Sequence, residues 1–116
     1  MTEIRIGQLA KVLGQDIDQT VRAIKIELFN GVIRDTRVDT GRLRGNWQTT
    51  TRVPATGEIE RTDEFGAVAE VHQNVTGHGV DYLTNNLNYA EVWEERDGMI
   101  ARNVARIDRI VREKTR

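Results

Sequence analysis

The stretch Val38-Asp39-Thr40-Gly41-Arg42-Leu43-Arg44-Gly45-Asn46-Trp47 separates two parts of the 116-residue chain that have different patterns. A long helical period precedes it, and residues that alternate like those of a β-strand follow it. Thr40 has the side chain of a helix N-cap, and Gly41 relaxes the backbone beside it. Because Leu43 and Trp47 are four residues apart, one helical turn would place both on the same face. We expect a joint that ends the helix and anchors Trp47 beneath the first strand.

Composition predicts one folded domain, residues 1–116, and limits the classes of function. Hydrophobic residues make up 38% of the chain and charged residues 30%, and the net charge is −1. No overall field therefore draws the protein to nucleic acid or to a membrane surface. Cysteine is absent, which excludes disulfides and fits a reducing compartment. The N-terminus lacks the apolar run of a signal peptide, and no stretch approaches the roughly 20 apolar residues that span a bilayer.

Apolar residues recur every three or four positions between residues 6 and 35, which is typical of one face of a helix. This stripe consists of Leu9, Leu13, Ile17, Val21, Ile24, Leu28 and Val32. One continuous helix of this length would be about 45 Å long. Gly14 is a weak point at which it would divide into a short helix and a longer one. The stripe fits core packing, or in part a contact with another subunit, because so long a helix is hard to cover.

Beyond Trp47 the pattern predicts an antiparallel meander of three to four strands. The candidate strands are residues 47–53, 58–62, 67–73 and 80–84. Residues 63–66 predict a turn, and the polar, glycine-containing residues 74–79 predict a flexible loop. Helical spacing returns between residues 88 and 96, and Asp97 is the expected N-cap of a last helix. Its apolar stripe consists of Ile100, Val104, Ile107 and Val111. The predicted fold class is α+β, with a long N-terminal helix, the meander, and C-terminal helices packed on the sheet.

The triplet Asp39-Thr40-Gly41 matches the catalytic motif of aspartic proteases. Those enzymes need two such carboxylates sharing a proton, so this chain would have to dimerise. The family places the triplet after an apolar strand, whereas here arginines at 34 and 37 precede it and arginines at 42 and 44 follow it. A turn with a helix cap is therefore the favoured interpretation of this triplet.

Other catalytic and metal-binding patterns are weak in this sequence. His72 and His78 are six residues apart and have no third ligand at a familiar spacing, so we expect no metal site. Serine and cysteine are both absent, and neither a phosphate-binding glycine loop nor a dinucleotide fingerprint is present. We expect a protein that is not an enzyme and that needs no cofactor.

Two groups of opposite charge lie close together near the C-terminus. The acidic group consists of Glu91, Glu94, Glu95 and Asp97, and the basic stripe consists of Arg102, Arg106 and Arg109. The basic stripe would suit phosphate groups of nucleic acid. Because the whole chain is not basic, a solvated face, or ion pairs within a subunit or between subunits, is the favoured interpretation.

Three motifs, taken in order, resemble those of a family of tailed-bacteriophage proteins, the tail-completion or neck proteins related to minor tail protein Z of phage lambda. The motifs are Thr40-Gly41-Arg42-Leu43-Arg44 with Trp47, then Asn88-Tyr89-Ala90-Glu91-Val92-Trp93-Glu94, then Gly98-Met99-Ile100. The resemblance covers roughly residues 10 to 110. Arg96-Asp97 departs from it, because the family has a glycine-led loop after the acidic turn, and this puts the local path of the chain in doubt.

The resemblance implies a structural virion protein of the head–tail connection, made in the host cytoplasm and located in the neck or tail. It implies a ring of six subunits around the DNA exit channel, between head-completion proteins and the tail terminator or tail tube. DNA would pass through without sequence-specific binding. The candidate residues for contacts between subunits are Tyr89, Glu91, Glu94, Glu95, Arg102, Arg106 and Arg109. The alternative function is a small nucleic-acid-binding protein that uses the basic C-terminal helix.

Overall fold

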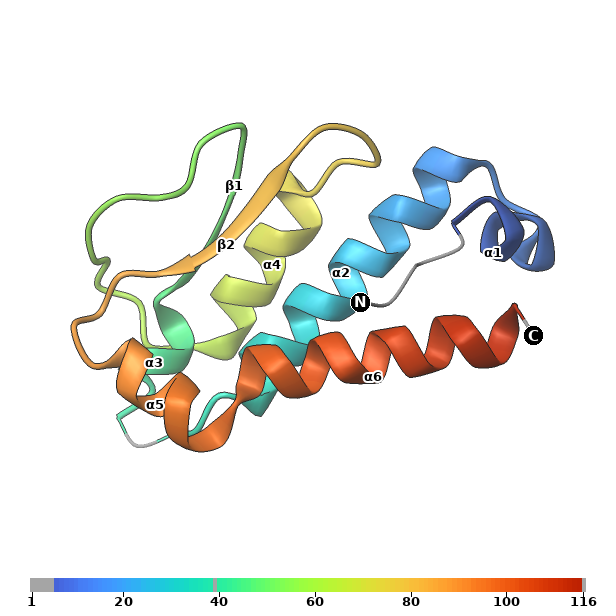
Figure 1. The fold of residues 1–116 in the computed structure, drawn as a ribbon. Coiled ribbons are helices and arrows are strands. Elements are labelled where there is room, and N and C mark those ends of the chain that lie inside the picture. The colour runs from blue at the N-terminus through green and yellow to red at the C-terminus, as the bar shows by residue number, and fades with distance from the viewer. Residues whose placement is uncertain (1–5, 39, 116) are drawn as a thin grey trace.

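The computed structural model describes residues 6–38 and 40–115, in which the chain forms six helices and two strands (Figure 1). These are α1 (Ile6–Leu13), α2 (Ile17–Asp35), α3 (Arg42–Gly45), β1 (Trp47–Thr51), α4 (Glu64–Asn74), β2 (Asp81–Asn85), α5 (Ala90–Asp97) and α6 (Met99–Lys114). Among the described residues, no helix is both long and apolar enough to cross a membrane. Asp39 of the protease-like triplet lies outside the described residues.

The predicted long N-terminal helix is wrong, because the chain forms two helices with a break after α1. Gly14 adopts a φ of +66°, a left-handed conformation that favours glycine. A capping box then starts α2: the carboxylate of Asp16 accepts a bond of 2.8 Å from the backbone N–H of Gln19, and the Gln19 side chain accepts one from the N–H of Asp16. The break therefore falls at the glycine that the sequence marked as weak.

The predicted meander of three to four strands is also wrong, because the described residues contain one sheet of two antiparallel strands. In this sheet Trp47 of β1 lies opposite Asn85 of β2, and Thr51 lies opposite Asp81. The two strands correspond to the first and last candidates. Residues 67–73 lie in α4, and residues 58–62 form neither helix nor strand.

Helix α4 forms because its N-terminus is capped and one of its faces is buried. The carboxylate of Asp63 accepts a bond of 2.6 Å from the backbone N–H of Gly66. Ala67 and Val71, four residues apart, are both buried, as is Val75 just after the helix. Apolar side chains at this spacing also fit alternate positions of a strand, so the period alone does not distinguish the two. The cap decides in favour of the helix.

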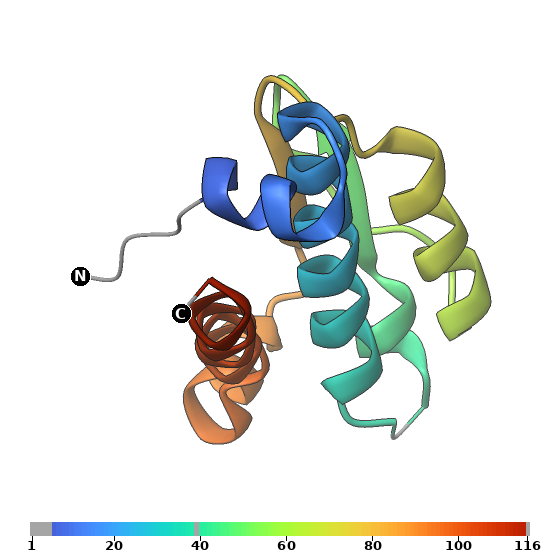
Figure 2. The ribbon, with the colours of Figure 1, turned by 90° about the vertical axis from the view of Figure 1, so that its right-hand side faces the viewer.

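The C-terminal helix packs against α2 and not, as predicted, on the sheet. Seen along the long axis of the molecule, α2 lies between α6 and α4 (Figure 2). The buried residues of α6 are Met99, Asn103, Ile107 and Val111. Ile100 and Val104 of the predicted stripe are 40% and 50% exposed. Asp97 is not the N-cap either: it ends α5, and Gly98, with a φ of +62°, precedes α6.

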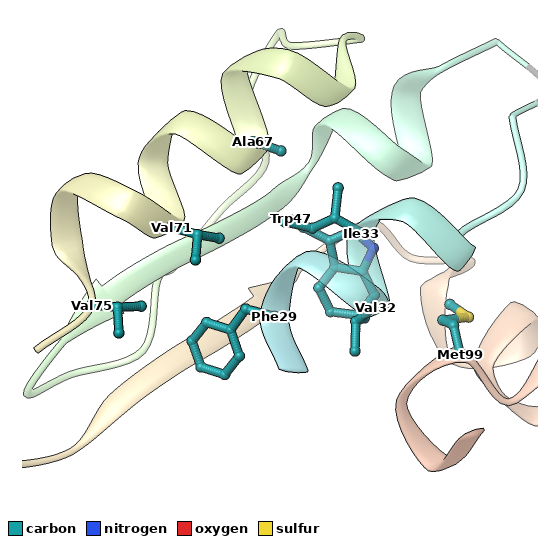
Figure 3. Close-up of a cluster of buried hydrophobic side chains, with 8 residues drawn as sticks. All are labelled: Phe29, Val32, Ile33, Trp47, Ala67, Val71, Val75 and Met99. Atoms are coloured by element: carbon teal, nitrogen blue, oxygen red, sulfur yellow. The ribbon is translucent and has the colours of Figure 1, made fainter. Parts of the chain in front are cut away.

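The main hydrophobic core joins α2, β1, α4 and the first residue of α6 (Figure 3). Its members are Phe29, Val32, Ile33, Trp47, Ala67, Val71, Val75 and Met99. A second cluster of Leu9, Ile107 and Val111 joins α1 to α6. A third cluster of Leu43, Leu87 and Ala90 joins α3 to the start of α5. Helix α2 is thus held from both sides.

Replacing Gly31 by alanine is expected to separate α2 from α6. A Cβ atom at Gly31 would lie 2.1 Å from Oδ1 of Asn103 and 2.4 Å from a guanidinium nitrogen of Arg106. Overpacking at such a contact costs about 1–3 kcal/mol, and the higher helix propensity of alanine offsets about 1 kcal/mol of this cost, so Gly31→Ala should lower the free energy of unfolding by up to about 2 kcal/mol in urea titrations. Gly7→Ala is the control, since a Cβ there meets nothing within 4 Å and alanine favours helix. A Gly31→Ala variant as stable as Gly7→Ala would contradict this account of the α2–α6 contact.

Candidate functional site

The joint between α2 and β1 is closed by a buried hydrogen bond between two side chains. Nε1–H of Trp47 donates to Oγ1 of Thr36 at 2.8 Å, and this hydroxyl donates to the carbonyl oxygen of Val32 at 2.7 Å. Both side chains are buried. The carbonyl oxygen of Thr36 in turn accepts bonds of 3.0 and 2.7 Å from the guanidinium of Arg44. A cation therefore caps the C-terminal end of α2, where the helix dipole favours positive charge.

A second arginine fixes the outer edge of β1. The guanidinium of Arg61 donates to the carbonyl oxygens of Gly45 at 2.7 Å and Trp47 at 2.6 Å. Two residues of α4 continue along this edge: the carboxylate of Glu70 accepts from the N–H of Thr49 at 2.7 Å, and the amide of Asn74 donates to the carbonyl of Thr49 at 2.8 Å. Sequence reasoning did not assign these roles to Arg44 and Arg61, because their carbonyl partners lie in other segments of the chain and leave no periodic signal.

The other residues of the predicted joint act differently from the prediction. The hydroxyl of Thr40 accepts from the N–H of Arg42 at 3.3 Å, but Gly41 occupies the N-cap position of α3, with a φ of +82°. Leu43 and Trp47 do not share a face, because α3 ends at Gly45. Leu43 belongs to the third cluster, whereas Trp47 belongs to the main core.

The charged residues proposed for contacts between subunits divide into two groups. Glu94 and Arg106 are bound within the subunit. The Glu94 carboxylate accepts a bond of 2.8 Å from the N–H of Ile100, at the first turn of α6, and Arg106 forms a salt bridge of 2.9 Å with Glu27. Glu91, Glu95, Arg102 and Arg109 are exposed and form no hydrogen bond or salt bridge with the described residues. Tyr89 precedes α5 and packs against the third cluster.

A small cleft next to the joint contains a stacked cation. Its volume is about 210 Å³, and its lining residues are Arg37, Thr40, Leu43, Tyr89 and Trp93. The guanidinium of Arg37 lies 3.7 Å from the centroid of the Trp93 ring and 3.0 Å from Oδ2 of Asp97. The hydrogen bond from Arg37 lowers the pKa of Asp97. This stack connects the segment after α2 to α5 and stabilises the packing of these two segments.

The predicted flexible loop, residues 74–79, is tied to α2 by Lys25. Nζ of Lys25 donates to the carbonyl oxygens of Thr76 and Gly79, both at 3.1 Å, and to Oδ2 of Asp81 at 2.9 Å. The Asp81 side chain is fully buried. Burial raises the pKa of Asp81, but the hydrogen bonds from Lys25 and from the N–H of Thr76 outweigh this effect, so its pKa lies below the usual value.

The two histidines do not lie together with other potential metal ligands among the described residues. His72 lies on α4, not in the predicted strand of residues 67–73, and its Nε2 is 3.3 Å from the amide nitrogen of Asn30. His78 is exposed, with Nδ1 3.8 Å from a carboxylate oxygen of Asp18. Within residues 6–38 and 40–115, no group of three potential metal ligands occurs. The contacts of His72 and His78 connect α2 to α4 and to the loop that follows α4.

Comparison of the chain with protein-family models, with curated proteins and with solved structures gave no match. The resemblance to tail-completion proteins therefore rests on the order of three motifs. In the folded chain the first two of these motifs meet. Leu43 of the first and Ala90 of the second belong to one cluster with Leu87, and Tyr89 and Trp93 pack against it.

Removing the hydroxyl of Thr36 is expected to destabilise the joint. Thr36→Val would leave the indole N–H of Trp47 buried without a partner, which costs about 1–3 kcal/mol. Thr36→Ser retains the hydroxyl and serves as the matched control. The free energies of unfolding of both variants, measured with urea, should differ in that direction. If the valine variant is as stable as the serine variant, the bond between Trp47 and Thr36 does not stabilise the joint.

Asp81 is expected to make stability depend on pH. Because its pKa is lower in the folded than in the unfolded chain, its contribution is full above the unfolded value of 3.8 and is lost as the pH falls through the lower folded value. At pH 7, Asp81→Asn should lower the free energy of unfolding by about 2 kcal/mol, the order of one hydrogen bond between charged groups. Urea titrations at pH 7, 5 and 3 should show this difference shrinking at the lowest pH. A constant difference would contradict the assignment.

Proposed function

We propose that this chain is a structural subunit of the head–tail connection of a tailed bacteriophage, and that six copies form a ring around the DNA exit channel. The observation that carries the proposal is the packing of the first two family-like motifs against each other. Leu43, Ala90 and Trp93 bring the joint and the acidic turn into one cluster. The third motif, Gly98-Met99-Ile100, forms the start of α6. Three short motifs that form one connected structural unit are better support than three separate matches.

Exposed apolar side chains support a role in assembly. Large hydrophobic residues that are exposed in the described part of the chain include Val12, Leu13, Ile17, Phe65, Ile100 and Val104. Three of these lie at the α1–α2 turn, and two lie one turn apart on α6. Apolar residues that gather on a surface commonly mark contacts with other proteins. Neighbouring subunits of a ring would cover them.

The proposed role assigns partners but no chemistry. A ring made of identical subunits needs two different, complementary faces on each copy. Head-completion proteins would contact one rim, and the tail terminator or tail tube would contact the other, as in the proteins that the motifs resemble. The DNA would pass through the channel without sequence-specific contacts. Neither a catalytic activity nor a cofactor is part of the proposal.

Charge reversal on α6 is expected to block ring formation. Arg106 is unsuitable for this test because it stabilises the subunit through Glu27, so the variant is Arg102→Glu with Arg109→Glu. Both side chains are exposed, and the subunit should therefore stay folded by circular dichroism. Native mass spectrometry should show the wild type at six times 13.2 kDa and the double variant as a monomer. Arg52→Glu, at an exposed position just after β1, is the matched control and should form normal rings.

Two results would contradict this proposal or part of it. Normal rings from the double variant would rule out a role of Arg102 and Arg109 in the contact. A wild type that stays monomeric at every concentration and is absent from purified particles would rule out the virion function. Retention of the isolated chain on DNA that weakens with salt would instead favour the nucleic-acid-binding alternative.

A further inference from the structure

An apolar groove of about 280 Å³ lies between α1, α2 and α6. Its apolar lining residues include Leu9, Leu13, Ala23, Ile24, Ile107 and Ile110, and its charged lining residues are Glu27 and Lys114. Sites for small organic ligands commonly measure about 300–1,000 Å³, so this groove lies at the small end of that range. Its size and lining suit one large hydrophobic side chain.

Phe65 is such a side chain, and its own fold leaves it uncovered. It is 83% exposed, more than any other large hydrophobic residue of the described chain. It lies in the first turn of α4, where the Asp63 cap fixes the backbone and Glu64 forms salt bridges with Arg34 and Arg44. Phe65 is therefore an aromatic ring held outward on a well-fixed helix end.

The groove and Phe65 lie at opposite ends of the molecule. Helix α4 begins beside α3 at one end, and α1 covers the other (Figure 1). The molecule is 41 Å long in this direction. The Phe65 side chain of a subunit therefore cannot reach the groove of the same subunit. Each copy carries this projecting aromatic side chain at one end and the groove at the other.

We propose that Phe65 of one subunit inserts into the groove between α1, α2 and α6 of the next subunit. This inference rests on the proposed ring, and it names the two faces that meet. A projection and a receptor at different places on one surface form a heterologous contact, which closes into a ring when the rotation allows it. Phe65 acts as the anchor of the contact, with the surrounding end surfaces supplying the remaining buried area.

The charges around Phe65 are balanced, and those around the groove are not. Asp63 lies two residues before Phe65 and is exposed. At the groove, the charge of Glu27 is neutralised by Arg106, whereas Lys114 forms no hydrogen bond or salt bridge with the described residues. Beside the projection, the carboxylates of Asp63 and Glu64 are matched by the guanidinium groups of Arg34 and Arg44, whereas Lys114 leaves the groove positively charged. A contact between two grooves would bring like charges together, and the pairing of Phe65 with the groove avoids this.

Single variants test each face separately. Phe65→Asp removes the projection, and Ala23→Trp fills the groove from an exposed position on α2. Each should weaken association by about 30-fold or more, as the loss of an interface anchor does. Circular dichroism and thermal unfolding should show each variant folded, because both positions are exposed. Val53→Asp, at another exposed hydrophobic residue, is the matched control and should assemble as the wild type does.

Mixing the two variants tests whether the faces meet each other. Phe65→Asp retains an intact groove, and Ala23→Trp retains an intact Phe65. Each alone should be monomeric, whereas an equimolar mixture should form a dimer of one copy of each, which cannot grow further. Native mass spectrometry distinguishes this dimer from either homodimer by mass.

Different outcomes overturn different statements. If the wild type forms rings and Phe65→Asp forms them equally well, the inference fails and the proposed function stands. A mixture of the folded variants that gives no heterodimer also overturns the inference. If the wild type never associates, the proposed function fails together with the inference.

Discussion

The hydrogen bond from the indole of Trp47 to the hydroxyl of Thr36 is the interaction on which the rest of the structure depends. It joins the residue that follows α2 to the first residue of β1, 11 positions further along the chain. Once Trp47 is fixed, β1 has a defined position, and α4 and α2 close over the same indole in the main core. Arg44 donates to the carbonyl oxygen of Thr36, and Arg61 donates to that of Trp47. The geometry of this joint therefore sets the orientation of α2 relative to the sheet.

The sequence predicted the elements whose local signals agree with their packing. The helical period of α2 and the β-branched residues of β1 are examples, and Gly14 marked the end of α1 correctly. Helix α4 was missed because apolar residues four positions apart fit both a helix and alternate positions of a strand, and the Asp63 cap that decides between them looked like part of a turn. Asn103 explains the error on α6: its amide bonds to the carbonyl of Met99 and to Asp35, so a polar side chain occupies the buried face.

The candidate site was predictable in its motifs but not in its contacts. The acidic group and the basic stripe are visible in the sequence, yet no sequence pattern tells whether a charge is bound inside the subunit. Glu94 caps the next helix and Arg106 reaches α2, across 79 positions in the chain. Phe65 was overlooked for a related reason, because a residue within a presumed turn attracts no attention until its exposure is seen. Contacts between residues far apart in the chain decide which side chains are bound and which are exposed, and such contacts leave no local pattern in the sequence.

The outer edge of β1 has one further consequence. Side chains of Arg61, Glu70 and Asn74 occupy the carbonyl of Trp47 and both backbone groups of Thr49, positions where another strand would bind. Another strand cannot hydrogen-bond to these backbone groups, because side chains already occupy them. This edge therefore resists the strand pairing that leads to aggregation. Any contact with another chain at this side of β1 would therefore have to use side chains instead of strand pairing.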